Sequence, residues 1–272
     1  GVMESIQFGH ADFVDERDKL TEINNLGDVG WTSFYSAFRG CSALGEVSGG
    51  NTSNVTTMQN MFLSSTATTI NSDNWDTSNV ESMAAMFNDC NSCQPALSSW
   101  NTSNVTDMSQ MLRDAISLDS SVRNWNTSKV TSFWRMFQRS SVFNDDIVNP
   151  DVELWDTSNV TNMETMFENT KVANPNVSKW NTSNVTSMQA LFKGNQVVQP
   201  DVSDWDTSNV TNFRDMFNGA TSANPDMSDW NVVKGSNMVS IFNNSGISDS
   251  NYSKFLIRAE STTTKTGVNL GT

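Results

Sequence analysis

The stretch that decides the fold is WDTSNVTNMETMF, residues 155–167, because close copies of it recur along the chain. Similar phrases begin at Gly50, Trp75, Trp100, Trp125, Trp180 and Trp205. Trp75, Trp100 and Trp125 lie 25 residues apart, as do Trp155, Trp180, Trp205 and Trp230, and a five-residue insertion separates the two groups. A period of this length is typical of proteins built from stacked coils.

Apolar residues keep the same place in each repeat, which we number from its tryptophan at position 0. Valine takes position 5, methionine or phenylalanine position 8, and phenylalanine position 12, where Leu112 stands once. This spacing predicts a short helix or 3₁₀ turn of about two turns, capped by the preceding Thr-Ser-Asn. All five prolines lie five residues before a tryptophan, so segments such as PDVSDW (200–205) predict a short strand that begins at proline.

Each coil is too small to bury its own apolar side chains, so we expect the coils to stack with their strands paired in parallel. The predicted fold class is an α/β repeat solenoid, leucine-rich-repeat-like, in a single domain over residues 1–272. Residues 31–246 would form about nine coils. Residues 1–30 and 247–272, the latter with an amphipathic stretch around Tyr252 and Phe255, would cap the two ends.

Composition narrows the class of partner. The formal charge is −14 and the pI is near 4.3, which disfavours nucleic acid or an anionic membrane as partner and favours an extracellular setting. No stretch approaches the roughly 18 apolar residues of a membrane span, so membrane insertion is not expected. Cys41, Cys90 and Cys93 suit free thiols or one small disulfide better than a zinc site.

The repeat also carries a family resemblance. The phrase WDTSNVTNMETMFENT resembles the repeat of the BspA-type leucine-rich-repeat surface proteins of bacteria, GDVGWTSFYSAFRGCSAL (27–44) is similar to their opening coil, and NYSKFLI (251–257) to their closing segment. This chain departs from the family in placing proline five residues before the tryptophan. The resemblance implies a solenoid on a secreted or surface-anchored protein, often one module of a larger adhesin, and it implies no catalytic residues.

Catalytic motifs are missing from the sequence. His10 is the only histidine and lies outside the repeats, and no phosphate-binding, dinucleotide-binding or zinc-protease motif occurs. We therefore predict that the protein is not an enzyme. A carbohydrate-active enzyme with paired carboxylates stays open as an alternative.

Binding is better supported, because the positions four and two before each tryptophan should point outward and vary between coils. The predicted ligand-binding residues are Ser98, Arg123, Asp151, Glu153, Asn176, Ser178, Asp201 and Asp226. Side chains that vary in this way would be expected if these positions bind a ligand, and equally if no function constrains them. A calcium ion, the one cofactor considered, would be shared by Asp201, Asp204, Asp226 and Asp229, which fall one coil apart.

The threonines at position 2, such as Thr157 and Thr182, form a further file with one member per coil. They could match an ice lattice or, as we favour, bond the backbone. The function predicted from sequence is a non-catalytic extracellular adhesion module, monomeric within a larger chain, that binds a peptide, protein or glycan. The alternative is a structural spacer without a ligand.

Overall fold

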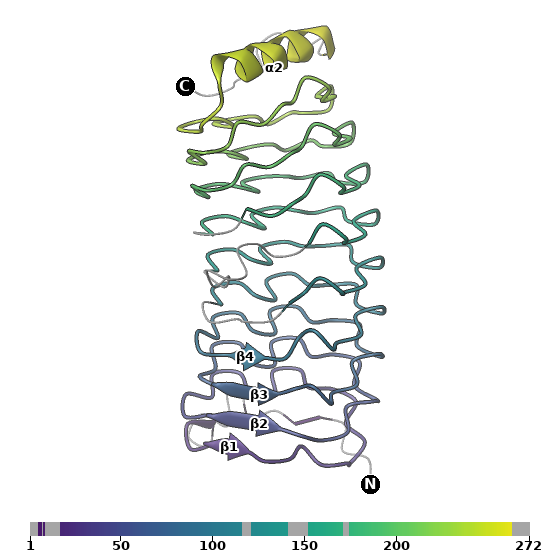
Figure 1. Cartoon of the computed structure of the whole chain (residues 1–272). Coiled ribbons are helices and arrows are strands. Elements are labelled where there is room, and N and C mark those ends of the chain that lie inside the picture. The colour runs from purple at the N-terminus through teal and green to yellow at the C-terminus, as the bar shows by residue number, and fades with distance from the viewer. Residues whose placement is uncertain are drawn as a thin grey trace.

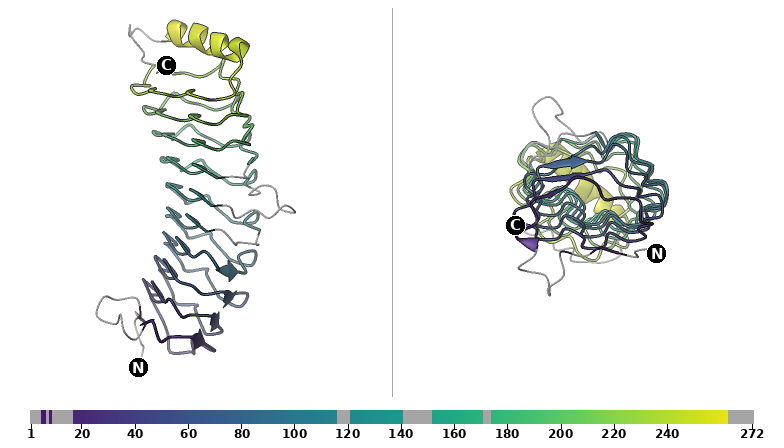
Figure 2. Two further views of the ribbon diagram at one scale, coloured as in Figure 1. Left: turned by 90° about the vertical axis from the view of Figure 1, so that its left-hand side faces the viewer. Right: turned by 90° about the horizontal axis from the view of Figure 1, so that it is seen from below.

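The chain winds into coils that lie one above the next from the N-terminus to the C-terminus (Figure 1). The computed structural model describes residues 5–6, 8, 17–115, 121–140, 152–170 and 174–262. Seen along the long axis, the coils superpose closely (Figure 2). Equivalent positions of successive repeats are therefore direct neighbours in space.

Four short strands form a parallel sheet at the N-terminal end of the stack. They are β1 (Glu22–Ile23), β2 (Glu46–Ser48), β3 (Thr69–Asn71) and β4 (Gln94–Pro95), in the order β1-β2-β3-β4. Val47 pairs with Ile70, and Ile70 pairs with Pro95. β4 is the last strand of this sheet among the described residues, and its Pro95 has no N–H with which to continue a ladder. Residues 22–23, which were predicted to belong to the N-terminal cap, form β1 and pair with β2.

The strand predicted between proline and tryptophan is wrong for the described part of the later coils. In PDVSDW, Ser203 and Asp204 form a turn, and Pro175 and Pro225 precede the same kind of turn. The missing N–H at this position explains the difference, because proline at the same place in successive coils removes the donor that a parallel ladder needs.

The continuous parallel ladder lies instead at position 7 of each repeat. Isolated bridges join one residue of each coil to the next, in the order Ser5, Ser33, Thr57, Ser82, Asp107, Ser132, Asn162, Ser187, Asn212 and Asn237. This ladder runs the length of the stack, whereas the four-stranded sheet covers only its beginning.

Of the short helix or 3₁₀ turn predicted over positions 5 to 12, the helix is wrong, because these residues form a series of tight turns that are closed, as in a 3₁₀ turn, by hydrogen bonds three residues back. The N–H of Met166 donates to the carbonyl of Met163 at 3.4 Å, three residues back. The N–H groups of Thr165 and Phe167 donate to Gln189 and Leu191 of the next coil at 2.8 and 2.9 Å. A helix needs those N–H groups for its own carbonyls, so bonding between coils excludes it.

Two residues of each described coil, at positions 10 and 14, adopt positive φ. Position 10 holds Ser36, Asn60, Ala85, Gln110, Arg135, Thr165, Ala190, Asp215 and Ser240, and position 14 holds Gly40, Ser64, Asp89, Asp114, Arg139, Asn169, Gly194, Gly219 and Asn244. A left-handed residue reverses the chain in a turn of type II. The apolar side chains at positions 8 and 12 therefore face inward without a helix.

Stacked aromatic rings fill the centre of the coils. Phe167 and Phe192 lie 5.7 Å apart at 4°, and Trp180 and Trp205 lie 6.3 Å apart at 5°. The valines at position 5 are fully buried beside them. The apolar positions read from the sequence are thus confirmed as the core.

The helix α2 (Asp249–Thr262) lies across the C-terminal end of the stack (Figure 1). Phe255 is buried and meets the ring of Phe242 edge-on at 5.3 Å, while Ile257 is 69% exposed. Arg258 donates from Nε to the carbonyl of Trp230 at 3.1 Å. The amphipathic stretch thus covers the last aromatic ring.

The three cysteines are all buried. Cys90 and Cys93 form a disulfide with a Cα–Cα distance of 5.5 Å, and Cys41 is a free thiol. Burial raises the pKa of Cys41 to about 11.

Candidate functional site

The recurring polar phrase holds the coils together. Thr182, at position 2, is buried and donates from Oγ1 to the carbonyl of Asp206 in the next coil at 2.9 Å. The same bond is made by Thr52, Thr77, Thr102, Thr127, Thr157 and Thr207. This threonine file is therefore a set of backbone partners, and its burial removes it from contact with an ice lattice.

Asparagine at position 4 and the Asp or Asn at position 1 act in a similar way. Asn184 donates from Nδ2 to the carbonyl of Ser158 in the previous coil at 2.7 Å. Asp206 accepts from the N–H of Ser208 at 2.9 Å, and hydrogen bonds from this N–H and from the Ser208 hydroxyl lower the pKa of Asp206. The phrase repeats because each coil needs the same bonds.

The predicted binding residues do face outward where the structure describes them. Ser98, Arg123, Asn176 and Asp201 are exposed, while Glu153, Ser178 and Asp226 are half-buried. The residue between each pair, such as Val177 or Val202, is buried. Asp151 lies outside the described residues. Their orientation is confirmed, and their role in binding stays a prediction.

Several of these side chains also stabilise their own turns. Asn176 accepts from the hydroxyl of Ser178 at 2.8 Å, and Asp201 accepts from that of Ser203 at 2.7 Å. Short polar side chains commonly hold a turn in this way. Part of this face is therefore needed by the fold.

A charged cluster joins three coils on the same face. The Glu153 carboxylate lies 2.5 Å from Lys179 Nζ. The hydrogen bond and charge of Lys179 are the main causes that lower the pKa of Glu153, and Asn176 and Arg123 add smaller effects. Stacking thus brings Arg123, Glu153 and Asn176 together, as their spacing in the sequence predicted.

The four aspartates proposed for calcium are not gathered into a site. Within the described ranges, no group of three or more His, Cys, Asp or Glu side chains is placed to hold a metal ion. Asp226 pairs instead with Lys254 of α2 at 2.8 Å, and Asp201 accepts from Ser203. The ammonium group of Lys254 supplies the positive charge that an ion would have brought to Asp226.

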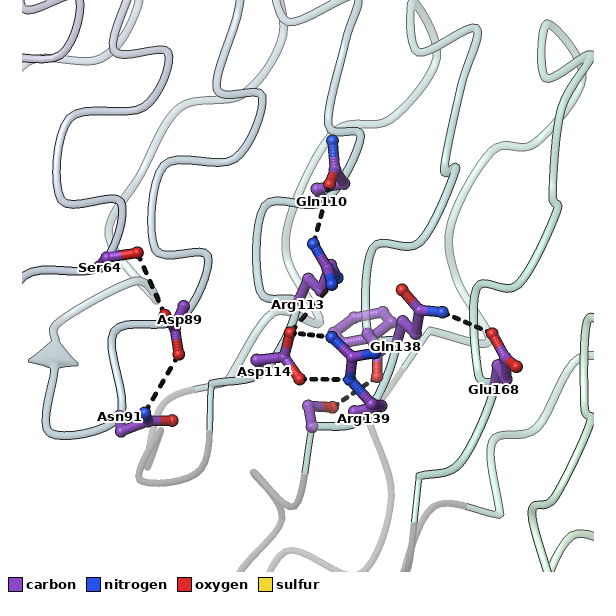
Figure 3. Close-up of polar contacts among 11 residues, drawn as sticks. Ser64, Asp89, Asn91, Gln110, Arg113, Asp114, Gln138, Arg139 and Glu168 are labelled. Carbon is purple, nitrogen blue, oxygen red and sulfur yellow. Dashed lines mark hydrogen bonds and ion pairs between the residues drawn. The ribbon is translucent and has the colours of Figure 1, made fainter. Parts of the chain in front are cut away.

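A second polar cluster, which the sequence reading missed, lies on the turns at positions 10 to 14 (Figure 3). Arg139 forms two bonds of 2.6 Å with the carboxylate of Asp114, and Arg113 Nε lies 3.3 Å from the same group. Gln138 donates to Glu168 in the next coil at 2.5 Å. This cluster therefore links three consecutive coils.

Trp134 lies close to this cluster and departs from the repeat. It occupies position 9, where the other described coils have Tyr35, Gln59, Ala84, Ser109, Glu164, Gln189, Arg214 and Val239. Its ring is half-buried, and the guanidinium carbon of Arg135 lies 4.5 Å from the ring centre. The signal in the sequence was a tryptophan outside the regular spacing, followed directly by arginine.

Burial and neighbouring charges shift the pKa of the arginines in this region. Burial is the main cause that lowers the pKa of Arg113, and Arg139 and Arg135 lower it further while Asp114 opposes them. The hydrogen bond from Arg139 to Asp114 raises the pKa of Arg139. Arg113, Arg135 and Arg139 are thus concentrated on a chain whose net charge is −14.

Comparison with known proteins identifies a family. No curated protein and no solved structure matches the chain. Within the described part, no helix has the length and apolar character needed to cross a membrane. A family model described as "Mycoplasma protein of unknown function, DUF285", a family found in BspA-like surface proteins, matches residues 32–149 and 147–255. Because these matches cover most of the stacked coils, the chain belongs to the DUF285 family.

Proposed function

We propose that this protein is a non-catalytic recognition module of a bacterial surface protein, with a leucine-rich-repeat-like solenoid that presents outward side chains to an extracellular peptide, protein or glycan. The observation that carries the proposal is the contrast between two sets of positions. Those that bond or pack between coils repeat, as Thr182 and Val185 do, whereas outward ones such as Arg123, Glu153 and Trp134 change from coil to coil.

A rigid frame supports such a role. The ladder at position 7 and the stacked rings hold the backbone that carries the outward side chains. Less conformational entropy is then lost on binding than with mobile loops. The concave and lateral faces of repeat proteins serve as binding surfaces for this reason.

Location outside the cell is part of the proposal. The family occurs in BspA-like surface proteins, and the acidic surface suits an extracellular setting. The disulfide between Cys90 and Cys93 adds support, because disulfides persist in oxidising compartments.

A spacer without a ligand is the second candidate function. It is favoured by Asn176, Asp201 and Asp226, whose side chains already bond within their own turns. If the protein is a spacer, the outward residues differ between coils because no function constrains them. A carbohydrate-active enzyme is the third candidate and requires two carboxylates that face each other across a cleft; turnover on polysaccharides would reveal it.

The test is binding of the labelled protein to an array of glycans, peptides and matrix proteins, with calcium and with a chelator. The matched variant combines Arg123→Ser, Glu153→Ser and Asp201→Asn, which place residues that the chain uses at equivalent positions, as in Ser178 and Asn176. Loss of binding at an unchanged melting temperature would support the face before the tryptophans. Binding that persists would move the site elsewhere on the coils, and a blank array would favour the spacer.

A further inference from the structure

Trp134 is an outward tryptophan at a position that does not require one. The core has its own tryptophan at position 0 of the same coil, Trp125, which is 3% exposed. Position 9 accepts Ser109 in the coil before and Glu164 in the coil after. Exposed aromatic surface of this kind is enriched at binding sites, because one large flat ring contributes much contact area with little entropy loss.

Arg135 and the Trp134 ring form one surface that is partly cationic and partly aromatic. Its guanidinium carbon lies 4.5 Å from the centre of the Trp134 ring. A guanidinium stacked on an aromatic face keeps its in-plane N–H donors for a planar acceptor such as a carboxylate. Arg135 Nε is shielded from solvent and has no hydrogen-bond partner among the described residues. Because a shielded Nε cannot reach a bound molecule, the terminal N–H groups of the guanidinium are the donors that could meet one.

The charge balance around the patch also favours an anion. Asp114 is shared between Arg139 and Arg113, so one carboxylate contacts two guanidinium groups. Arg135 has no ion pair in the part of the chain that the structure describes. Asp89 and Glu168 act on Arg139 only at longer range and are bonded by other side chains.

A peptide fits this surface less well than a sugar. The N–H groups of Phe133, Arg135 and Phe137 donate to the next coil, so none of these three is left to pair with an added strand. The residues at position 9 of the adjacent coils, Ser109 and Glu164, are polar and half-buried, so they offer no apolar pocket for an anchor residue. One flat ring beside amide and guanidinium groups suits a sugar ring with hydroxyls and a carboxylate.

We propose that Trp134, Arg135 and Arg113 form a binding site for a carboxylate-bearing sugar of a sparsely charged glycan. The sugar ring lies against the exposed part of Trp134, and its carboxylate accepts from Arg135 and Arg113. The net charge of −14 repels a dense polyanion, which limits the ligand to widely spaced acidic sugars. This inference rests on the proposed recognition function and names the ligand class for it.

The residues found at the same positions in other coils can serve as substitutions that should preserve the fold. Trp134→Gln places the residue found as Gln189, and Arg135→Ala places that found as Ala190, which has the same positive φ. Arg113→Asn reproduces Asn88 at position 13. The control is Arg214→Gln, which removes an arginine from position 9 three coils away.

The experiment is titration calorimetry with an oligosaccharide of alternating glucuronate and N-acetylglucosamine. Its carboxyl-reduced counterpart and a glutamate-rich peptide are the comparison ligands. We expect Trp134→Gln and Arg135→Ala each to weaken binding about 10-fold or more, because each removes a central contact, and Arg214→Gln to change it less than about twofold. The carboxyl-reduced sugar should bind as weakly as Arg135→Ala binds the acidic one.

The outcomes separate this inference from the function on which it rests. Equal binding of the acidic and reduced sugars, or full binding by Trp134→Gln, overturns the site. Binding of the peptide alone, lost in Trp134→Gln, overturns the glycan class. If no uronate binds but the array gives a ligand that the Arg123, Glu153 and Asp201 variant loses, this inference fails and the recognition function stands. A blank array overturns both.

Discussion

The indole Nε1 of Trp180 lies 2.9 Å from the carbonyl oxygen of Val152, one coil earlier in the stack. The same bond, at 2.9 to 3.1 Å, is made by Trp125, Trp155, Trp205 and Trp230. Each of these tryptophans therefore fills the core with its ring and ties its coil to the previous one with its N–H. This double role accounts for tryptophan at position 0 of these coils, whereas the indole Nε1 of Trp100 is buried without a hydrogen-bond partner among the described residues.

Replacing Trp180 should separate these two contributions. Trp180→Ala empties a buried slot and should lower the free energy of unfolding by about 3–5 kcal/mol. Trp180→Phe keeps a ring but leaves the Val152 carbonyl without its donor, which should cost about 1–3 kcal/mol. Urea denaturation measures both values. A loss below about 1 kcal/mol for the alanine variant would contradict the core position.

The two threonines of the coil at Trp180 should differ in their effect. Thr182→Val removes a buried hydroxyl that bonds the Asp206 carbonyl, so unfolding should become easier by about 1–3 kcal/mol. Thr186→Val is the matched control, because that hydroxyl also bonds a carbonyl, of Thr161 at 3.1 Å, but is exposed to water. Its effect should stay within about 0.5 kcal/mol. Equal effects would show that burial does not decide the value of these bonds.

The glycines at position 14 allow a test of the left-handed turns. Gly219→Ala places a side chain at φ +74°, which should cost about 1–2 kcal/mol. Gly194→Ala should cost more, because a Cβ there would also clash with Oδ1 of the Asn169 side chain. Thermal unfolding of the two variants shows which one loses more stability. A stabilising Gly219→Ala would contradict the positive φ.

The aspartates at position 1 should contribute a dependence of stability on pH. Hydrogen bonds from Ser78 and Ser158, through the hydroxyl and then the N–H, lower the pKa of Asp76 and Asp156 below 3.8. A carboxyl with a lowered pKa stabilises the fold above its unfolded value, and this contribution is lost as pH falls through the folded value.

The variant with Asp76→Asn, Asp156→Asn and Asp206→Asn should therefore be less stable than the wild type at neutral pH, and the difference should shrink as the pH falls below 3.8. The chain already has asparagine at this position in Asn101 and Asn181, so the turns should be kept. Urea midpoints from pH 7 down to acid pH give the comparison. Parallel curves for the two proteins would exclude the contribution.

Cys41 should be unreactive in the folded protein. Its thiol is buried, and a pKa of about 11 leaves it protonated at neutral pH, whereas the thiolate is the reactive form. We expect a thiol reagent to label Cys41 only after unfolding in urea. Rapid labelling in buffer would show that this coil opens locally.

Part of the candidate site followed from the repeat. Counting from the tryptophans placed Arg123, Glu153 and Asn176 outward on successive coils, and in the structure Lys179, Asn176 and Arg123 all act on Glu153. The four aspartates considered for calcium form no metal-binding group within the described residues, and one of them, Asp226, pairs with Lys254 of α2. Trp134 was missed because the prediction rested on residues that recur at fixed positions, and Trp134 stands at position 9, where the residue differs between coils.

By itself, the sequence determined the period, the buried positions and the outward ones, because a repeat that buries its side chains only against its neighbours must place them in the same way each time. Only the tertiary structure decided what the backbone does between those positions. A spacing of three and four residues suits a helix and a chain of tight turns alike, and the choice depends on where the N–H groups donate. In this protein groups such as those of Thr165 and Phe167 donate to the next coil, a partner that exists only once the coils have stacked.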